Sequence, residues 1–196
     1  MSPLARRLAV LAVVLLPAAA FAQEPQQVIV DNPITYGAGA GVSVPIGDAE
    51  DGLERGFVVQ GFARFRLTDS HFAPRLDLSY QQFDLNSDNV GVGGTASVVS
   101  GTVNLHLFLG GGTIRPYVIG GIGAYWLKFE TDATPVIPSA SESSTRFGLT
   151  GGGGLSYRIN ARTSIYGEIR LDNILNDEGP VDSDLQLVPL TFGITF

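Results

Sequence analysis

The C-terminal stretch Leu185-Gln-Leu-Val-Pro-Leu-Thr-Phe-Gly-Ile-Thr-Phe196 alternates between two kinds of side chain. One face of an extended chain carries the apolar residues Val188, Leu190, Phe192, Ile194 and Phe196. The opposite face carries Pro189, Thr191, Gly193 and Thr195. A period of two indicates a β-strand whose two sides meet different surroundings. Because the chain ends in this strand, its last edge needs a partner for the backbone N–H and C=O groups, and closure of a barrel supplies one.

Seven earlier segments alternate in the same way, separated by connections rich in Gly, Asp, Asn and Ser. The predicted strands are residues 34–46, 56–67, 74–84, 95–108, 115–129, 146–158, 163–173 and 185–196. Each is near or above the roughly 9–11 residues that a tilted strand needs to cross a bilayer.

The connections alternate in length as well. The long ones, mostly acidic, are residues 47–55, 85–94, 130–145 and 174–184, whereas the short ones are residues 68–73, 109–114 and 159–162. Transmembrane barrels have short periplasmic turns and longer outer loops. The sequence therefore predicts an all-β fold, an eight-stranded antiparallel up-and-down transmembrane β-barrel with both termini in the periplasm.

The N-terminus has the layout of a secretory signal peptide. Arg6 and Arg7 precede an apolar run over residues 8–20, and Ala20-Phe21-Ala22 forms a small-x-small cleavage site. The apolar run is shorter than the roughly 20 residues of a spanning helix. We therefore expect residues 1–22 to be a cleaved signal peptide, residues 23–33 a short leader, and residues 34–196 the barrel domain.

Composition excludes several classes of protein. The net charge is −7, with 19 acidic and 12 basic residues, which argues against nucleic acid as a partner. There is no cysteine, so the chain has neither a disulfide framework nor a thiolate metal site.

Charged side chains fall on the strand faces opposite the aliphatic ones. The predicted barrel-interior charge network comprises Arg64, Arg66, Arg75, Asp77, Glu168, Arg170 and Asp172. Asn104, His106 and Lys128 are assigned to the same polar side. Folding about residues 68–73 places Arg64 opposite Asp77 and Arg66 opposite Arg75, with Arg66 and Arg75 sharing a counterion or lying at the wet inner mouth. An eight-stranded bore is just wide enough for side chains, and buried charges must be paired, so a packed plug is favoured over a polar conduit.

Aromatic residues at the strand ends suggest two membrane interfaces. The expected inner belt comprises Tyr36, Phe65, Tyr117, Tyr157 and Phe196, and the expected outer belt comprises Phe57, Tyr125, Phe129 and Phe147. Periodicity by itself also permits a soluble barrel with an apolar interior.

Three glycine-rich stretches, residues 37–41, 120–123 and 151–154, are followed by no predicted helix. A phosphate loop must open a helix, so these glycines more simply allow bending or close approach of large neighbours. The segment Asp84-Leu-Asn86-Ser-Asp88 begins like a calcium loop but has Asn89 and Thr95 at two essential positions, which favours a solvated turn. Weak binding of divalent cations is expected at the outer acids Asp48, Glu50, Asp51, Glu54, Asp84, Asp88, Asp177, Glu178, Asp182 and Asp184.

Three segments, residues 115–125, 148–157 and 190–196, resemble the small eight-stranded outer-membrane barrel family that includes the OmpA transmembrane domain and OmpX. The resemblance covers residues 34–196. It implies location in the bacterial outer membrane, contact with outer-membrane lipid and lipopolysaccharide, and a role for Phe196 as a signal read by the outer-membrane assembly machinery. Activity does not follow, because such barrels serve as anchors, adhesins, receptors and enzymes.

Catalysis is not expected. Lipid A deacylases of this shape carry what resembles a His-x-Ser pair, whereas the histidines here are His71-Phe-Ala and His106-Leu-Phe. No cofactor, metal centre or Ser–His triad is predicted. The leading hypothesis is a structural or cell-surface interaction role through the outer loops. A small passive porin-like channel is the first alternative, and a soluble periplasmic lipocalin-like binding protein is the second.

Overall fold

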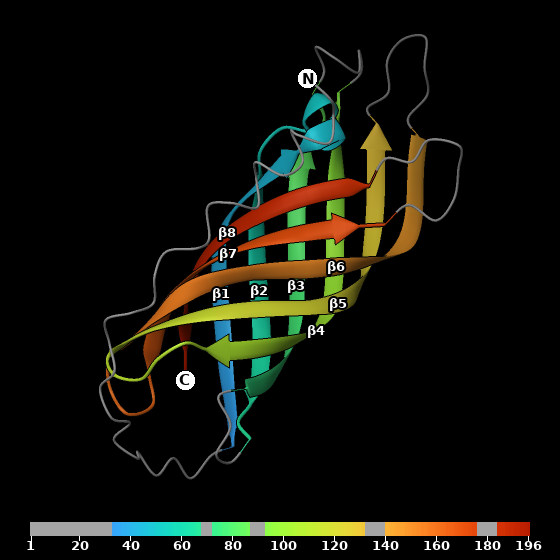
Figure 1. Ribbon diagram of the computed structural model, residues 1–196. Helices are drawn as coiled ribbons and strands as arrows, with labels where there is room; N and C mark the ends of the chain where they lie inside the picture. Colours follow the sequence, from blue (N-terminus) through green and yellow to red (C-terminus); the bar gives the residue numbers. More distant parts are fainter. Residues whose placement is uncertain (1–32, 68–71, 87–92, 132–139, 176–183) are drawn as a thin grey trace, which may run out of the picture.

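The computed structural model describes residues 33–67, 72–86, 93–131, 140–175 and 184–196. These residues form a closed barrel in which each strand pairs antiparallel with its sequence neighbours (Figure 1). The elements are β1 (Ile34–Ile46), the 3-10 helix η2 (Gly47–Asp51), β2 (Gly56–Phe65), β3 (Phe72–Asp84), β4 (Gly94–Phe108), β5 (Ile114–Thr131), β6 (Ala140–Arg158), β7 (Ser164–Ile174) and β8 (Leu185–Thr195). The predicted fold class and all eight strands are confirmed.

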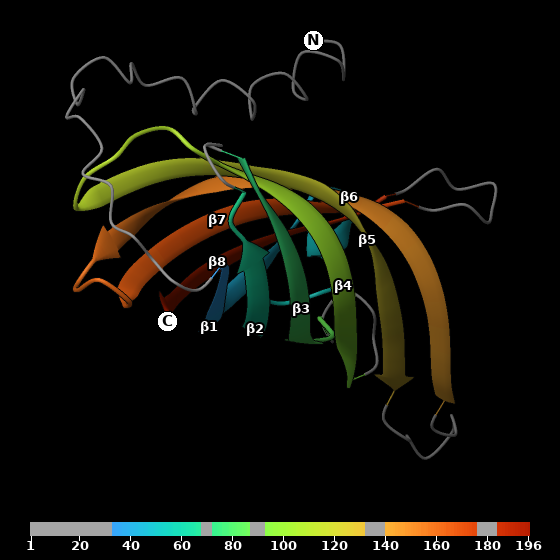
Figure 2. The same ribbon diagram turned by 90° about the horizontal axis from the view of Figure 1, so that it is seen from below.

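The closing seam joins the first and last strands, which lie side by side (Figure 2). Their register runs from Gly37↔Thr195 to Ile46↔Gln186. Beyond β8, Phe196 exchanges two backbone hydrogen bonds with Tyr36, at 2.9 and 3.0 Å. The C-terminal edge is therefore fully paired, as the alternation of the last strand predicted.

Pro189 does not mark the bulge that its position suggested. It pairs with Ser43 on the β1 side, and the β1–β8 register is the same above and below it. On the β7 side, pairing stops after Ile169↔Leu190 and resumes in the same register at Asp172↔Leu187. The missing N–H of proline thus leaves a local gap in one ladder, without the extra residue that defines a bulge.

The outer surface of the barrel is apolar. Its most exposed large side chains include Leu78 at 69%, Phe147 at 67%, Ile122 at 64% and Phe192 at 63% exposure. Large apolar side chains exposed on every strand suit lipid rather than water. In the described part of the chain, no helix is long and apolar enough to span a membrane.

The two aromatic belts are corrected in part. Tyr36, Phe57, Phe147, Tyr157 and Phe196 are exposed on the outer surface, and Phe65 is half-buried. Tyr117 and Tyr125 are instead buried in the interior, at 3% and 0% exposure, and Phe129 packs against the buried apolar residues there. The prediction failed in β5 because its glycine-rich stretch is apolar on both faces, so alternation did not identify the inward side. Phe72 and Trp126 are exposed aromatics that the prediction lacked.

The interior changes character along the barrel axis. Its middle is polar and charged, whereas its outer third holds an apolar cluster. The buried members of this apolar cluster are Leu53, Phe83, Ala96, Val98, Tyr125, Leu127, Ile174 and Leu187. The barrel therefore has its hydrophobic core on the side of the long connections.

Glycines on one strand make room for interior rings from another. A Cβ atom at Gly37 would collide with the ring of Phe62, and one at Gly154 would collide with Tyr117. The glycine-rich stretches lie inside β1, β5 and β6, and each strand continues beyond its stretch, so none of them opens a helix. Their role is close approach, because the neighbouring rings occupy the space that a side chain would need.

Candidate functional site

The middle of the interior holds an ion-pair network of Arg75 and Asp77 from β3 with Glu168 and Arg170 from β7. Arg75 donates from Nη2 to Asp77 Oδ1 at 2.6 Å and from Nη1 to Glu168 Oε2 at 2.8 Å. Arg170 donates from Nε to Glu168 Oε1 at 2.6 Å and from Nη2 to Asp77 Oδ1 at 2.8 Å. Each guanidinium thus bridges both carboxylates, and every member has side-chain exposure of 7% or less.

Neutral groups from other strands complete the ion-pair network. Asn104 Nδ2 donates to Asp77 Oδ2 at 2.8 Å, and Tyr117 Oη donates to Glu168 Oε2 at 2.9 Å. Arg170 Nη2 also donates to Gln60 Oε1 at 2.7 Å. The guanidinium of Arg75 lies 3.5 Å from the ring centroid of Phe62. Because these groups come from β2, β3, β4, β5 and β7, the contacts cross the bore and hold opposite walls together.

The remaining predicted network residues lie elsewhere in the barrel. Asp172 is buried on the outer side of the ion-pair network, where Gln81 Nε2 donates to its Oδ2 at 3.4 Å. Arg64 is buried on the inner side, with Nη1 3.4 Å from His106 Nδ1. Arg66 is exposed beyond the last residue of β2, so its assignment to the interior is wrong. It lies at the inner mouth, which was the alternative location expected for it, because β2 ends at Phe65.

The predicted pairing across β2 and β3 is also wrong. Arg64 is opposite Arg75, and Asp77 is opposite Phe62, which is a shift of two residues from the predicted register. Side-chain direction has a period of two, so this shift leaves all of these residues on the interior face. The direction of each charge was therefore predictable, whereas its partner was not.

Lys128 was assigned to the polar interior, but the structure places it outside. Its side chain is 51% exposed, and Nζ donates to Glu130 Oε1 at 2.8 Å. Both residues occupy the outer end of β5. The error has the same origin as that for Tyr117 and Tyr125, because one wrong choice of face inverts every residue of a strand.

Sequence reasoning missed Tyr117 as an interior hydrogen-bond donor. It also missed the link from Gln60 Nε2 to Tyr166 Oη and to Thr191 Oγ1, each at 3.1 Å. The available signal was Gly154, which faces Tyr117 across the β5–β6 pair. A glycine beside a large residue on the facing strand indicates that the large side chain lies over it.

The first outer connection closes over the apolar cluster. Gly47 has φ of 66°, a left-handed conformation that glycine adopts readily, and it reverses the chain into η2. The helix buries Ala49, and Leu53 then enters the apolar cluster. Glu54 N–H donates to Asp84 O at 2.9 Å, and Asn86 N–H donates to Gly52 O at 3.0 Å. The first two outer connections are therefore bonded to each other above the bore.

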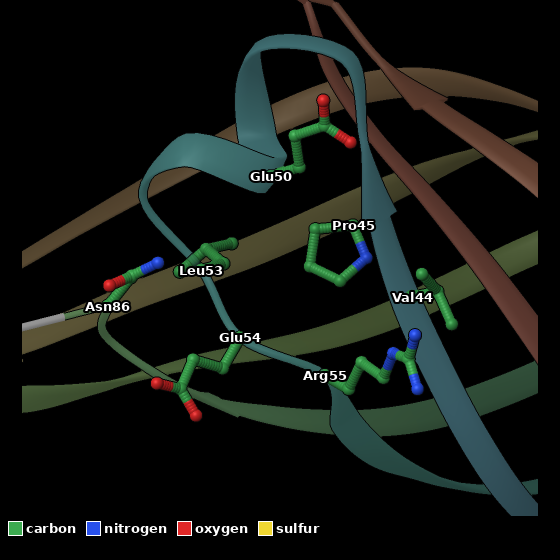
Figure 3. A pocket seen from close by; sticks show the side chains of 7 residues that line it. All are labelled: Val44, Pro45, Glu50, Leu53, Glu54, Arg55 and Asn86. Atoms are coloured by element: carbon green, nitrogen blue, oxygen red, sulfur yellow. The ribbon is translucent and has the colours of Figure 1, made fainter. Parts of the chain in front are cut away.

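A groove of about 460 Å³ opens beside this closure on the outer rim (Figure 3). It is lined by Val44, Pro45, Glu50, Leu53, Glu54, Arg55 and Asn86. Val44 and Pro45 line the groove from β1, and the charged side chains come from the connection between β1 and β2 (Figure 3). The groove thus offers apolar contact and charges of both signs to a ligand outside the barrel.

The acidic residues of the outer connections give no preformed metal centre in the part of the chain that the structure describes. Within that part, no group of three or more His, Asp or Glu residues is arranged to hold a metal ion. The predicted cation-binding acids Asp88, Asp177, Glu178 and Asp182 lie outside the described residues.

The two histidines differ in what the structure shows. His71 lies outside the described residues. His106 is 1% exposed, and its ring packs edge-on against Tyr117 at a centroid distance of 4.2 Å. It also lies 4.4 Å from the ring of Phe108. Among the described residues, His106 thus combines ring packing with the polar contact to Arg64.

The comparisons with known proteins agree with this architecture. The family described as outer membrane protein beta-barrel domain matches residues 8–196. No curated protein is a significant match to the chain. Among solved structures, Neisserial surface protein A is 15% identical with a TM-score of 0.55, and the alignment covers 84% of this chain and 96% of that one.

Two further solved structures have the same fold. A major outer membrane protein from Thermus thermophilus is 13% identical with a TM-score of 0.61, over 83% of this chain and 97% of that one. The N-terminal β-barrel domain of Pseudomonas aeruginosa OprF is 15% identical with a TM-score of 0.50, over 84% and 98%. At these identities the likeness concerns the fold alone.

Proposed function

Because the chain belongs to the outer membrane protein β-barrel domain family, we propose that it is a closed, non-catalytic barrel that acts at the cell surface through its outer connections. Outer-membrane lipid and lipopolysaccharide surround it in this proposal, and residues 1–22 are a cleaved signal peptide. N-terminal sequencing of the mature chain tests the last point, since the first residue expected after cleavage is Gln23.

The side chains that cross the bore are the observation that supports the proposal. The ion-pair network joins β3 to β7 through the middle of the barrel. Above it, Leu53 adds a side chain from the first outer connection to the apolar cluster. Two successive layers of interlocked side chains leave the outer connections as the surface available to a partner.

A small passive channel is the second candidate function, favoured by the polar character of the interior middle. Single-molecule conductance in a planar bilayer separates the two. We expect no discrete openings from the wild-type chain. Reproducible unitary openings, absent from an equally reconstituted membrane without protein, would favour the channel. A soluble lipocalin-like binder would need a polar exterior, which is opposite to the observed band of exposed Leu78, Ile122 and Phe192.

The surface role is tested at the groove on the outer rim. Glu50→Gln with Glu54→Gln removes both carboxylates of its lining, and Glu142→Gln, at an exposed position of β6, is a matched control. Cells are first matched for the amount of folded barrel, which is measured by its heat-dependent gel mobility (the heat-modifiable fraction). They are then compared for binding of purified lipopolysaccharide with and without Mg²⁺, and for adhesion to immobilised matrix proteins. We expect the double variant to reduce at least one binding activity and the control to reduce none. Equal binding by all variants, and by a chain lacking residues 132–139, would reject the surface role.

The proposed weak binding of divalent cations belongs to the same acidic rim. Carboxylate oxygens suit Ca²⁺ and Mg²⁺, and these ions also bridge anionic lipopolysaccharide. Catalysis is not part of the proposal, and we expect no release of fatty acid from lipid A or phospholipid by the reconstituted barrel.

A further inference from the structure

The inner end of the barrel holds a second charged cluster, separate from the ion-pair network. Arg64 of β2 and Arg115 of β5 lie against the same aromatic ring, that of Phe108 at the end of β4. Their guanidinium carbons are 5.0 and 4.8 Å from the ring centroid. Arg64 is 8% exposed, and Arg115 is half-buried. Two like charges thus lie against one ring at the inner mouth.

No carboxylate among the described residues forms an ion pair with either arginine. The interior carboxylates Asp77 and Glu168 are already bridged by Arg75 and Arg170. The cations also act on one another, because Arg115 repels Arg64 and is itself repelled by Arg66 and Arg158. Among the described residues, the inner mouth therefore carries an excess of positive charge, although the chain as a whole is acidic.

The hydrogen-bonding capacity of this arginine pair is mostly unused within the described part of the barrel. A guanidinium has five N–H donors. Arg64 contacts His106 Nδ1 at 3.4 Å, and the buried Arg115 Nε has no acceptor among the described residues. The ring of Phe108 attracts cations through its face, but it offers no oxygen. Unfilled donors and like charges together create a demand for an anion that brings several acceptor oxygens.

We propose that Arg64 and Arg115 bind a phosphate-class oxyanion at the inner mouth of the barrel, with Phe108 positioning the two guanidinium groups. Arginine is suited to this ligand because its planar fork donates two parallel hydrogen bonds to adjacent oxygens of one anion. The phosphate belongs either to a phospholipid headgroup of the inner leaflet or to a free anion of the periplasm. The site goes beyond the proposed surface role, since it lies at the opposite end of the barrel from the outer connections.

The test uses the full chain purified in dodecyl maltoside without phosphate. Urea unfolding is followed by the gel-mobility shift of the folded barrel, at constant ionic strength, in sodium chloride, in sodium phosphate, and in chloride with short-chain phosphatidylglycerol. The variants are Arg64→Gln, Arg115→Gln and their combination. Arg162→Gln, at an exposed position of the inner turn after β6, is the matched control.

Binding to the folded state alone raises the unfolding midpoint as ligand is added. We expect phosphate or phosphatidylglycerol to raise the midpoint of the wild type and of Arg162→Gln, and to leave the double variant unchanged. In chloride, Arg115→Gln should not be less stable than the wild type, because the substitution removes a repulsion. A purely structural arginine would instead lower stability equally in all three solutions.

Comparison of the phosphatidylglycerol and inorganic phosphate solutions identifies the source of the bound phosphate group. A response to phosphatidylglycerol alone assigns a headgroup, a response to inorganic phosphate alone assigns a free anion, and a response to both assigns the shared oxyanion chemistry. Broadening of the ³¹P resonance of inorganic phosphate or of the lipid by the wild type gives a second readout that needs no variant to fold. The absence of both a midpoint shift and broadening overturns the proposal, as does a full response in the double variant.

Discussion

Substitution of Asp77 by alanine should be among the most damaging single changes in the barrel. The carboxylate accepts hydrogen bonds from Arg75 at 2.6 Å, from Arg170 at 2.8 Å and from Asn104 at 2.8 Å. Its removal leaves two buried guanidinium groups to share the single charge of Glu168. Because the side chain of Asp77 is 3% exposed, water does not replace it at low cost.

The expected magnitude follows from the cost of an uncompensated buried charge. Removal of one partner from a buried ion pair destabilises a protein by about 3–5 kcal/mol. With a urea dependence of about 2 kcal/mol per molar, a loss of about 4 kcal/mol lowers the unfolding midpoint by about 2 M. Asp84→Ala is the matched control, since Asp84 is the exposed last residue of the same strand. Its effect should stay within about 0.5 kcal/mol.

A double variant separates the two effects of losing Asp77, which are the lost hydrogen bonds and the unbalanced positive charge left in the interior. Asp77→Ala combined with Arg170→Met leaves Arg75 paired with Glu168, so the interior charges balance again. We expect this double variant to be more stable than Asp77→Ala alone, although Arg170→Met destabilises the wild type. Unfolding is measured by gel mobility and by the fluorescence of Trp126, the one tryptophan of the chain. Equal midpoints for Asp77→Ala and Asp84→Ala would refute the role of the ion pairs, and additive losses in the double variant would refute the charge argument.

Leu78→Arg introduces a charge on the lipid-facing surface of β3 and should lower the free energy of unfolding in vesicles by about 2–4 kcal/mol. Leu109→Arg, in an inner turn, should lower it by at most about 1 kcal/mol. Similar urea midpoints for the two variants would contradict the assigned faces. Deletion of Phe196 should reduce the heat-modifiable fraction in cells more than Pro189→Ala does, because it removes the terminal aromatic and two hydrogen bonds to β1; equal fractions on quantitative gels would count against this. Gly41→Ala should open the β1–β8 seam, since its Cβ would collide with the carbonyl oxygen of Leu190; unchanged protease resistance of the folded barrel would exclude the collision.

The architecture was largely readable from the sequence because strand faces depend on a local period. Alternation located all eight strands and put Arg75, Asp77, Glu168 and Arg170 on inward faces. It failed in β5, where apolar residues and glycines occupy both faces. Burial of Tyr117 was therefore missed, although it follows from the same alternation of side chains between the two faces of a strand.

Which interior side chains contact one another was not readable from the sequence, because each contact depends on the positions of several strands. Arg64 and Arg75 are opposite each other in the register of β2 and β3. The turn sets this register, whereas the pattern of inward and outward faces does not. The contacts of Arg75 and Arg170 with Glu168 and Asp77 span residues far apart in the chain. No local pattern reports a distance across the bore.

By itself, the sequence determined eight strands with two chemically different faces and an up-and-down order, because the period-two repeat and the alternating lengths of the connections are properties of consecutive residues. The closing strand received its partner from the count of eight strands and the alternating connection lengths, and Phe196 does meet Tyr36 at the seam. Only the tertiary structure decided that the interior is layered. The ion-pair network lies at the middle, the apolar cluster lies beneath the first outer connection, and Arg64 and Arg115 lie against Phe108 at the inner mouth. Barrel closure and strand stagger bring these residues together across the bore, and both depend on the whole set of strands.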